Sequence, residues 1–216
     1  MELFTSEGCS SCPPADHVLA ELAARAASES LPVYPLAFHV DYWNGLGWRD
    51  RFSRSSYSDR QQGYSAIGAS GSVYTPQIVV NGEAECVGSQ ARQVDALIAA
   101  ARQHEPRSQI ELSARRSELG IQVSYRVNGD TRDRVLNLAL VEARAESQVE
   151  NGENAGAHLV HVNVVRVFTT RSLTAETSGR WSVRPDPDFA DGRLGVVAFA
   201  QGVPQGNISG ASAVEL

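Results

Sequence analysis

The sequence predicts an α/β domain over residues 1–106 and an antiparallel β domain over residues 107–216, with Pro106 at the boundary. Three observations support this fold class. In the first part, short apolar runs alternate with patterns of helical spacing. In the second part, runs of period-two character are separated by turns rich in glycine and asparagine. The 216 residues are 42% apolar and 20% charged, enough for domains with hydrophobic cores.

The first domain opens with a short strand over residues 3–5, followed by a helix over residues 13–28. Alanine, leucine and glutamate dominate the helix, and its apolar residues recur at helical spacing. The apolar run at residues 33–40 is typical of a buried strand. A further helix is predicted near residues 50–63.

Asn81-Gly82 is a strong signal for a two-residue hairpin turn. It joins predicted strands at residues 77–80 and 84–87, and an amphipathic helix follows at residues 90–103. The resulting order, β-α-β-α-β-β-α, is that of a thioredoxin-like fold.

The second domain is predicted to be antiparallel and sandwich-like, because several short strands alternate with turn signals. Its expected strands cover residues 109–114, 119–127, 135–145, 158–169, 181–183, 194–200 and 208–214.

Cys9 and Cys12 form a C-x-x-C pair between the first strand and the helix that starts at Pro13. Free N–H groups and the helix dipole favour negative charge at this point, so the pKa of the Cys9 thiol should be lowered. Because the thiolate is the reactive form, Cys9 is the predicted nucleophile. Cys12 is placed to resolve the mixed disulfide.

The segment Tyr74-Thr75-Pro76 precedes a predicted strand. We predict a cis Thr75–Pro76 bond, since only X–Pro bonds adopt cis at modest cost. Such a bond would turn the Thr75 backbone outward beside the sulfurs, so Tyr74, Thr75 and Pro76 are predicted to bind the substrate. The alternative is an ordinary trans proline that opens a strand.

Four sequence blocks carry a family resemblance: ELFTSEGCSSCPPAD at residues 2–16, FHVDYW at 38–43 with Gly47-Trp48, YTPQ at 74–77 and NGENAG at 151–156. They resemble a bacterial thioredoxin-like family of unknown function, whose members are typically secreted or periplasmic. The resemblance covers nearly the whole chain. It implies the thioredoxin fold and a thiol–disulfide activity, and it names no substrate.

His39, Asp41 and Trp43 come at the end of the second predicted strand. That strand should neighbour the first one, so the three residues are expected beside Cys9, behind the groups that react. His39 would share protons with a cysteine, or Asp41 would act as a buried base. In the alternative interpretation, the aromatic residues pack a loop over the helix and Asp41 serves as a cap.

Three other features carry weaker signals. Cys86 is interpreted as a buried free thiol, with a third metal ligand or a regulatory thiol as alternatives. His158 and His161 should point to opposite faces of one strand, which favours structural roles. The loop at residues 151–156 is either a functional loop that reaches the cysteine pair or a solvated turn.

The leading functional prediction is a thiol–disulfide oxidoreductase without an organic cofactor. Its partners would be a protein or small thiol/disulfide substrate and a redox partner protein. One alternative is copper(I) binding or delivery through Cys9, Cys12 and His39, since thiolate and imidazole suit that ion. Another is an interaction module in which the cysteine pair is a structural disulfide.

Charge and hydropathy exclude several kinds of partner and of site. The net charge is −6 and no basic run is present, so nucleic acid is not an expected partner. No apolar run reaches the roughly 18–20 residues of a membrane span. A second C-x-x-C pair at zinc spacing is lacking, so no metal site is expected. Met1 leads directly into a strand, so we expect a removed export signal or tether and a periplasmic or secreted protein.

Overall fold

The computed structural model describes residues 1–68, 72–189 and 192–216. The chain folds into two compact units, and each unit combines segments that are distant in the sequence. The units are Met1–His104 with Arg144–Val164, and Glu105–Ala143 with Val165–Leu216.

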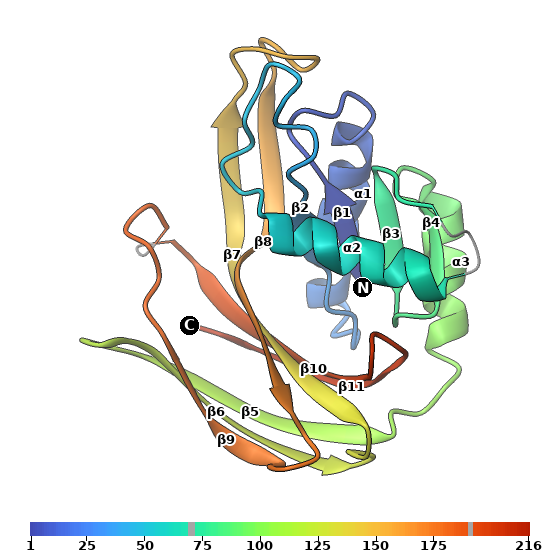
Figure 1. Ribbon diagram of the computed structural model, residues 1–216, viewed down its shortest axis with the longest axis vertical. Helices are drawn as coiled ribbons and strands as arrows, with labels where there is room; N and C mark the ends of the chain where they lie inside the picture. Colours follow the sequence, from blue (N-terminus) through green and yellow to red (C-terminus); the bar gives the residue numbers. More distant parts are fainter. Residues whose placement is uncertain (69–71, 190–191) are drawn as a thin grey trace. The chain divides into compact units, whose positions relative to one another are not determined.

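Short strands and the helices of the molecule alternate in the first unit (Figure 1). Strand β1 pairs in parallel with β2 and antiparallel with β3, and β4 pairs antiparallel with β3. The elements are β1 (Glu2–Thr5), α1 (Pro13–Ser28), β2 (Leu36–His39), α2 (Ser55–Ile67), β3 (Gln77–Val80), β4 (Ala84–Val87) and α3 (Ala91–Ala101).

Local sequence signals account for several of these elements. Helix α1 starts with Pro13. Proline lacks a backbone N–H, but an N–H at the first position of a helix would have no partner within the helix. It buries Leu19 and Leu22 against a core that includes Leu3 and Ile78. The predicted helix at residues 13–28, the β3–β4 hairpin and the pairing of the first two strands are therefore confirmed.

Helix α2 starts at Ser55, later than the predicted residue 50. The Asp50 carboxylate accepts the N–H of Phe52 at 2.8 Å, and the His39 carbonyl accepts the N–H of Arg54 at 3.2 Å. These bonds hold residues 50–54 in a turn, so the helix begins after them.

None of the helices in the described part of the chain has the length and hydropathy of a membrane span.

Antiparallel strands form the second unit. Strands β5 (Ser108–Ser117), β6 (Gly120–Gly129) and β9 (Ser178–Val183) make a three-stranded sheet, in the order β5-β6-β9. Strands β10 (Leu194–Gly202) and β11 (Ile208–Glu215) pair with each other. The core of this unit contains side chains that alternate along the strands, among them Val123, Leu138, Trp181 and Val196.

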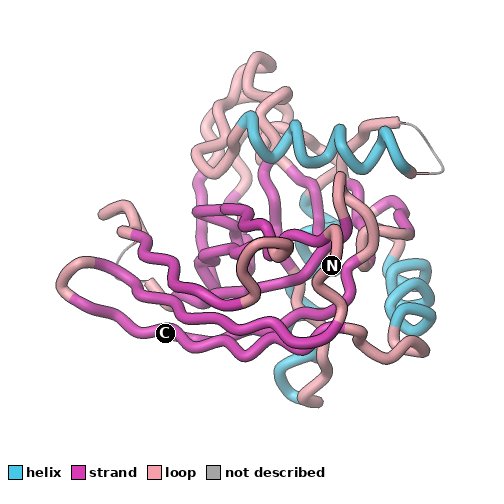
Figure 2. The backbone as a smooth tube through the Cα atoms, turned by 60° about the horizontal axis from the view of Figure 1, so that its bottom comes forward, coloured by secondary structure: helices cyan, strands magenta, loops and turns pink. Residues whose placement is uncertain are grey.

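The predicted fold class, an α/β thioredoxin-like fold followed by an antiparallel β-sandwich-like domain, is wrong. Strands dominate the described chain, which has only three helices (Figure 2). Eight of the described strands form one mixed sheet, which includes β7 (Arg134–Gln148) and β8 (His158–Ser172). The order of its strands is β11-β10-β7-β8-β2-β1-β3-β4.

Two long strands explain the error. Strands β7 (Arg134–Gln148) and β8 (His158–Ser172) come from the second half of the sequence, yet β8 pairs in parallel with β2 at Val164 and Ala37. The sheet of the first half is thereby extended by later strands. A period-two pattern reports which face of a strand is buried and does not report its hydrogen-bonding neighbour.

Candidate functional site

The candidate site is centred on the disulfide between Cys9 and Cys12, at the junction of β1 and α1. The Cys9 N–H donates to the Ser6 carbonyl at 3.2 Å. The Cys12 carbonyl accepts the N–H groups of Ala15 at 2.8 Å and Asp16 at 3.1 Å, so it closes the first turn of α1. The cysteines therefore lie at the positive end of the α1 dipole. Both are 0% exposed.

Thr75 contacts the disulfide directly. Its Oγ1 donates to Cys9 Sγ at 3.3 Å and accepts the Trp43 indole N–H at 2.8 Å. Ser11 Oγ also lies 3.3 Å from the same sulfur. The predicted cis Thr75–Pro76 peptide bond is confirmed. Of the predicted site residues, the structure thus places Thr75 against Cys9 and Trp43 against Thr75.

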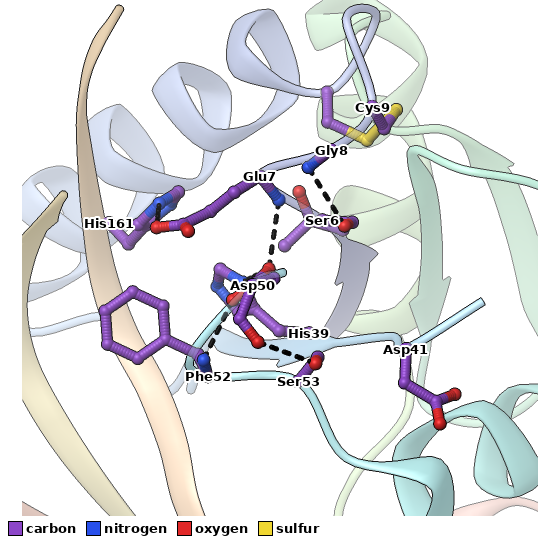
Figure 3. Close-up of polar contacts among 12 residues, drawn as sticks. Ser6, Glu7, Gly8, Cys9, His39, Asp41, Asp50, Phe52, Ser53 and His161 are labelled. Atoms are coloured by element: carbon purple, nitrogen blue, oxygen red, sulfur yellow. Dashed lines mark hydrogen bonds and ion pairs between the residues drawn. A yellow bond between two sulfur atoms is a disulfide. The ribbon is translucent and has the colours of Figure 1, made fainter. Parts of the chain in front are cut away.

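Tyr74 and Asp41 are directed elsewhere. The Tyr74 hydroxyl donates to the Glu85 carboxylate on β4. Ser58 of α2 donates to Asp41 Oδ1 at 2.5 Å and accepts the Asp41 N–H at 3.1 Å. In Figure 3, Asp41 lies away from Cys9. These bonds tie Asp41 to the Ser58 side chain, while the start of α2 at Arg54 has no side-chain cap.

His39 pairs with a carboxylate that the sequence analysis did not single out. Its Nδ1 lies 2.6 Å from Asp50 Oδ2, which also accepts the Glu7 N–H at 2.9 Å (Figure 3). Burial raises the pKa of Asp50, but His39 and the backbone donors of Glu7 and Phe52 outweigh burial and lower it. Asp50 is therefore a buried carboxylate at neutral pH.

A buried triad of ionisable side chains centres on His161, which the sequence analysis did not identify as a site residue. Its Nε2 lies 3.4 Å from Glu7 Oε1, and its Nδ1 lies 3.5 Å from Asp16 Oδ2. The Trp48 indole donates to Glu7 Oε2 at 2.8 Å, and the Thr5 hydroxyl donates to Asp16 Oδ1 at 2.9 Å. Each carboxylate thus accepts a hydrogen bond from a neutral side chain in addition to its ion-pair contact with the imidazole.

The charges of His161 and Glu7 follow from their contacts. Burial lowers the pKa of His161, but Asp16 and Glu7 outweigh it and raise that pKa to about 10. Burial raises the pKa of Glu7. Its polar contacts, of which the one with His161 has the largest effect, outweigh burial and lower that pKa below its usual value. At neutral pH His161 is therefore an imidazolium, and the Glu7 carboxyl beside it is ionised.

The rings of His39 and His161 meet edge to face at a centroid distance of 4.7 Å, so the His39–Asp50 pair and the His161 triad form one buried cluster of ionisable groups. Such clusters of buried ionisable groups mark functional sites more often than ordinary cores. The sequence analysis had singled out His39 alone among its members, although the positions of Glu7 and Asp16 on either side of the cysteine pair were a further signal. The members, each at most 6% exposed, are Glu7, Asp16, His39, Asp50 and His161.

The loop at residues 151–156 reaches the cysteine segment, so it is not a turn that contacts solvent alone. Asn154 Nδ2 donates to the carbonyls of Glu7 at 2.8 Å and Cys9 at 3.0 Å. Glu153 Oε2 accepts the Ser10 N–H at 3.1 Å. These contacts join segments more than 140 positions apart in the sequence.

Cys86 is buried and free, as predicted. Burial, with a smaller contribution from Glu85, raises the pKa of this thiol to about 11. Cys86 is therefore an unreactive thiol at neutral pH. Within residues 1–68, 72–189 and 192–216, no group of three or more histidine, cysteine or acidic side chains is arranged to hold a metal ion.

Replacing Thr75 with valine should slow the alkylation of reduced Cys9 by iodoacetamide at pH 7 by about fivefold, equivalent to ~1 kcal/mol. The reason is the loss of the hydroxyl that points at Cys9 Sγ, since such a donor stabilises the thiolate. Alkylation followed by mass spectrometry measures the rate. Thr169→Val on β8 is a matched control, and an equal effect of both substitutions would contradict the expectation.

Three comparisons place the chain among known proteins. The model of the family described as "Protein of unknown function (DUF1223)" matches residues 1–201. The crystal structure of protein AGR_C_4864 from Agrobacterium tumefaciens is similar, with 25% sequence identity and a TM-score of 0.70. That match covers 99% of this chain and 91% of the other. No curated protein matches.

Proposed function

Since this chain belongs to the DUF1223 family, whose function is unknown, we propose a function from the site itself: the protein is a thiol–disulfide oxidoreductase. Cys9 is the nucleophile and Cys12 is the resolving cysteine. The observation that carries this proposal is the Cys9–Cys12 disulfide at the start of α1, with the Thr75 hydroxyl on the Cys9 sulfur.

In the oxidising direction, a substrate thiolate attacks Cys9 Sγ and the Cys9–Cys12 bond breaks. Cys12 leaves as a thiolate, which takes up a proton. A second substrate thiolate then attacks the substrate sulfur of the mixed disulfide, and Cys9 leaves. Two electrons pass from the substrate dithiol to the cysteine pair, and the substrate leaves as a disulfide.

In the reducing direction the same steps run backwards. The Cys9 thiolate attacks a substrate disulfide, and Cys12 then attacks Cys9 Sγ and releases the reduced substrate. The helix dipole of α1 favours the negative charge that Cys9 carries in both directions. The direction depends on the reduction potential of the pair and on the redox partner protein that resets it.

The proposed partners are a cysteine-bearing protein or a small thiol or disulfide. The proposed compartment is the periplasm or the exterior, where disulfides persist. The proposed reaction requires no organic cofactor, because this chain supplies both of the cysteine sulfurs that exchange with the substrate.

A redox titration against glutathione tests the proposal. We expect the Cys9–Cys12 pair to exchange with the buffer at a potential between about −120 and −270 mV, the range of known catalytic pairs. We also expect the protein to accelerate insulin reduction or the oxidation of a reduced protein. A potential below about −300 mV without any rate acceleration would instead identify a structural disulfide.

A further inference from the structure

The loop between β7 and β8, residues 150–156, forms a strap across the cysteine loop. Backbone hydrogen bonds close its base, from the Val149 N–H to the Ala157 carbonyl at 2.9 Å and from the Gly156 N–H to the Val149 carbonyl at 2.8 Å. Its residues are exposed apart from Asn154, which is half-buried. The strap is therefore anchored at its base and contributes little to the core.

The strap holds both sides of one peptide group. Glu153 accepts the Ser10 N–H, and Asn154 donates to the Cys9 carbonyl, which is the other end of the same Cys9–Ser10 peptide. A second bond from Asn154 reaches the Glu7 carbonyl. The bonds from Ser10 lower the pKa of Glu153, so its carboxylate is ionised and accepts strongly at neutral pH.

On its other side the strap rests on the loop that carries Trp48. Gly152 has φ +78°, and a β-carbon on it would lie 3.1 Å from the Trp48 β-carbon. Gly47, with φ +100°, faces the Gly152 α-carbon, which a Gly47 β-carbon would approach to 3.3 Å. Two glycines thus let the backbones of the strap and of this loop meet closely.

The closed strap has a consequence for reactivity. An attacking thiolate needs access to a disulfide sulfur, yet Cys9 and Cys12 are each 0% exposed. Some covering segment must therefore move before exchange occurs. Trp43 also lies over this region, but Gly8 packs against its β-carbon and Thr75 accepts its indole N–H. Three polar contacts hold the strap to the cysteine loop, and most residues of the strap are exposed. Few contacts and high exposure are typical of segments that open locally.

We propose that the strap is a gate over the Cys9–Cys12 disulfide, opened by an extended cysteine-bearing polypeptide that takes over its hydrogen bonds to the Cys9–Ser10 peptide. The side chains of Asn154 and Glu153 supply the donor and the acceptor that a polypeptide backbone also supplies. A small thiol has no such groups, so it reacts only when the strap opens by itself. The gate deepens the proposed oxidoreductase function and rests on it for its biological role.

The test measures how fast the oxidised protein is reduced in a single round, by dithiothreitol and by an extended cysteine-containing peptide. Asn154→Ala removes two hydrogen bonds of the closed strap, so the rate with dithiothreitol should rise about tenfold. The rate with the peptide should rise less, because the peptide displaces the strap itself. Asn154→Asp, which keeps the shape and loses the donor, should act in the same direction.

Asn151→Ala, at an exposed position of the same loop, is the matched control and should leave both rates unchanged. Thermal unfolding verifies that each variant is folded. An unchanged or slower dithiothreitol rate in both folded Asn154 variants would refute the gate. Equal acceleration of both reductants would refute the polypeptide as its opener. Neither readout requires turnover, so these failures are distinct from a lack of oxidoreductase activity in the wild type.

Discussion

Replacing Cys9 with serine should abolish disulfide exchange, reducing it to the uncatalysed rate, because a serine hydroxyl neither forms a thiolate nor accepts a disulfide bond. Replacing Cys12 with serine should instead leave Cys9 able to attack while removing the resolving thiol. The Cys12→Ser variant should therefore accumulate a mixed disulfide with its substrate. Non-reducing electrophoresis and intact-mass measurement distinguish the two outcomes.

Both variants lack the disulfide, so their difference reports the roles of the sulfurs rather than the loss of the cross-link. Cys86→Ala is the control for a cysteine outside the site and should keep the wild-type activity, since that thiol is buried and free. If Cys9→Ser formed the mixed disulfide and Cys12→Ser did not, the assigned order of attack would be reversed.

Replacing His161 with leucine should lower the free energy of unfolding at pH 7 by about 3–5 kcal/mol, the usual cost of removing one partner of a buried ion pair. The substitution would leave Glu7 and Asp16 buried without the imidazolium between them. Protonation of one carboxyl limits the loss. Urea denaturation, followed by tryptophan fluorescence, measures it.

His158→Leu is a matched control on the same strand. His158 is exposed and pairs with Glu146 at 3.1 Å on the surface, so its removal should leave the unfolding free energy nearly unchanged. Equal losses for the two substitutions would contradict an energetic role of the buried pair.

The His161 pair also predicts a pH dependence. The pKa of His161 rises from its ordinary 6.5 to about 10 in the folded protein, so the folded state retains its proton where the unfolded state loses it. The stabilisation is complete below pH 6.5 and is lost progressively as the pH rises to 10. The difference in stability between the wild type and His161→Leu should therefore shrink between pH 7 and pH 10. A constant difference would show that the imidazole stays neutral.

Several features of this protein were predictable from sequence because short-range chemistry decides them. The pairing of a C-x-x-C motif with Pro13 located the start of α1 and the disulfide there. Asn81-Gly82 located the β3–β4 hairpin, and Thr75-Pro76 the cis bond. In each case the signal and the structure lie within a few residues, where backbone sterics leave few alternatives.

Long-range contacts were beyond the same reasoning. His161 followed a period-two pattern and was assigned a structural role, because no local feature shows that Glu7 and Asp16 meet it. Asn154 lay in a loop that was equally consistent with a solvated turn. The fold class failed for the same reason, since the pairing of β8 with β2 joins strands that are far apart in the sequence.

The sequence alone therefore determined the disulfide pair, its helix and the proline turn that faces it, because each depends on neighbouring residues. Only the tertiary structure decided that a mixed sheet carries the site, that a cluster of buried ionisable groups lies beside the disulfide, and that the loop at residues 150–156 bonds to the Cys9–Ser10 peptide. Those features depend on which distant segments of the chain pack against each other. A hydrophobic pattern specifies which face of an element is buried, but it does not specify the segment that covers this face.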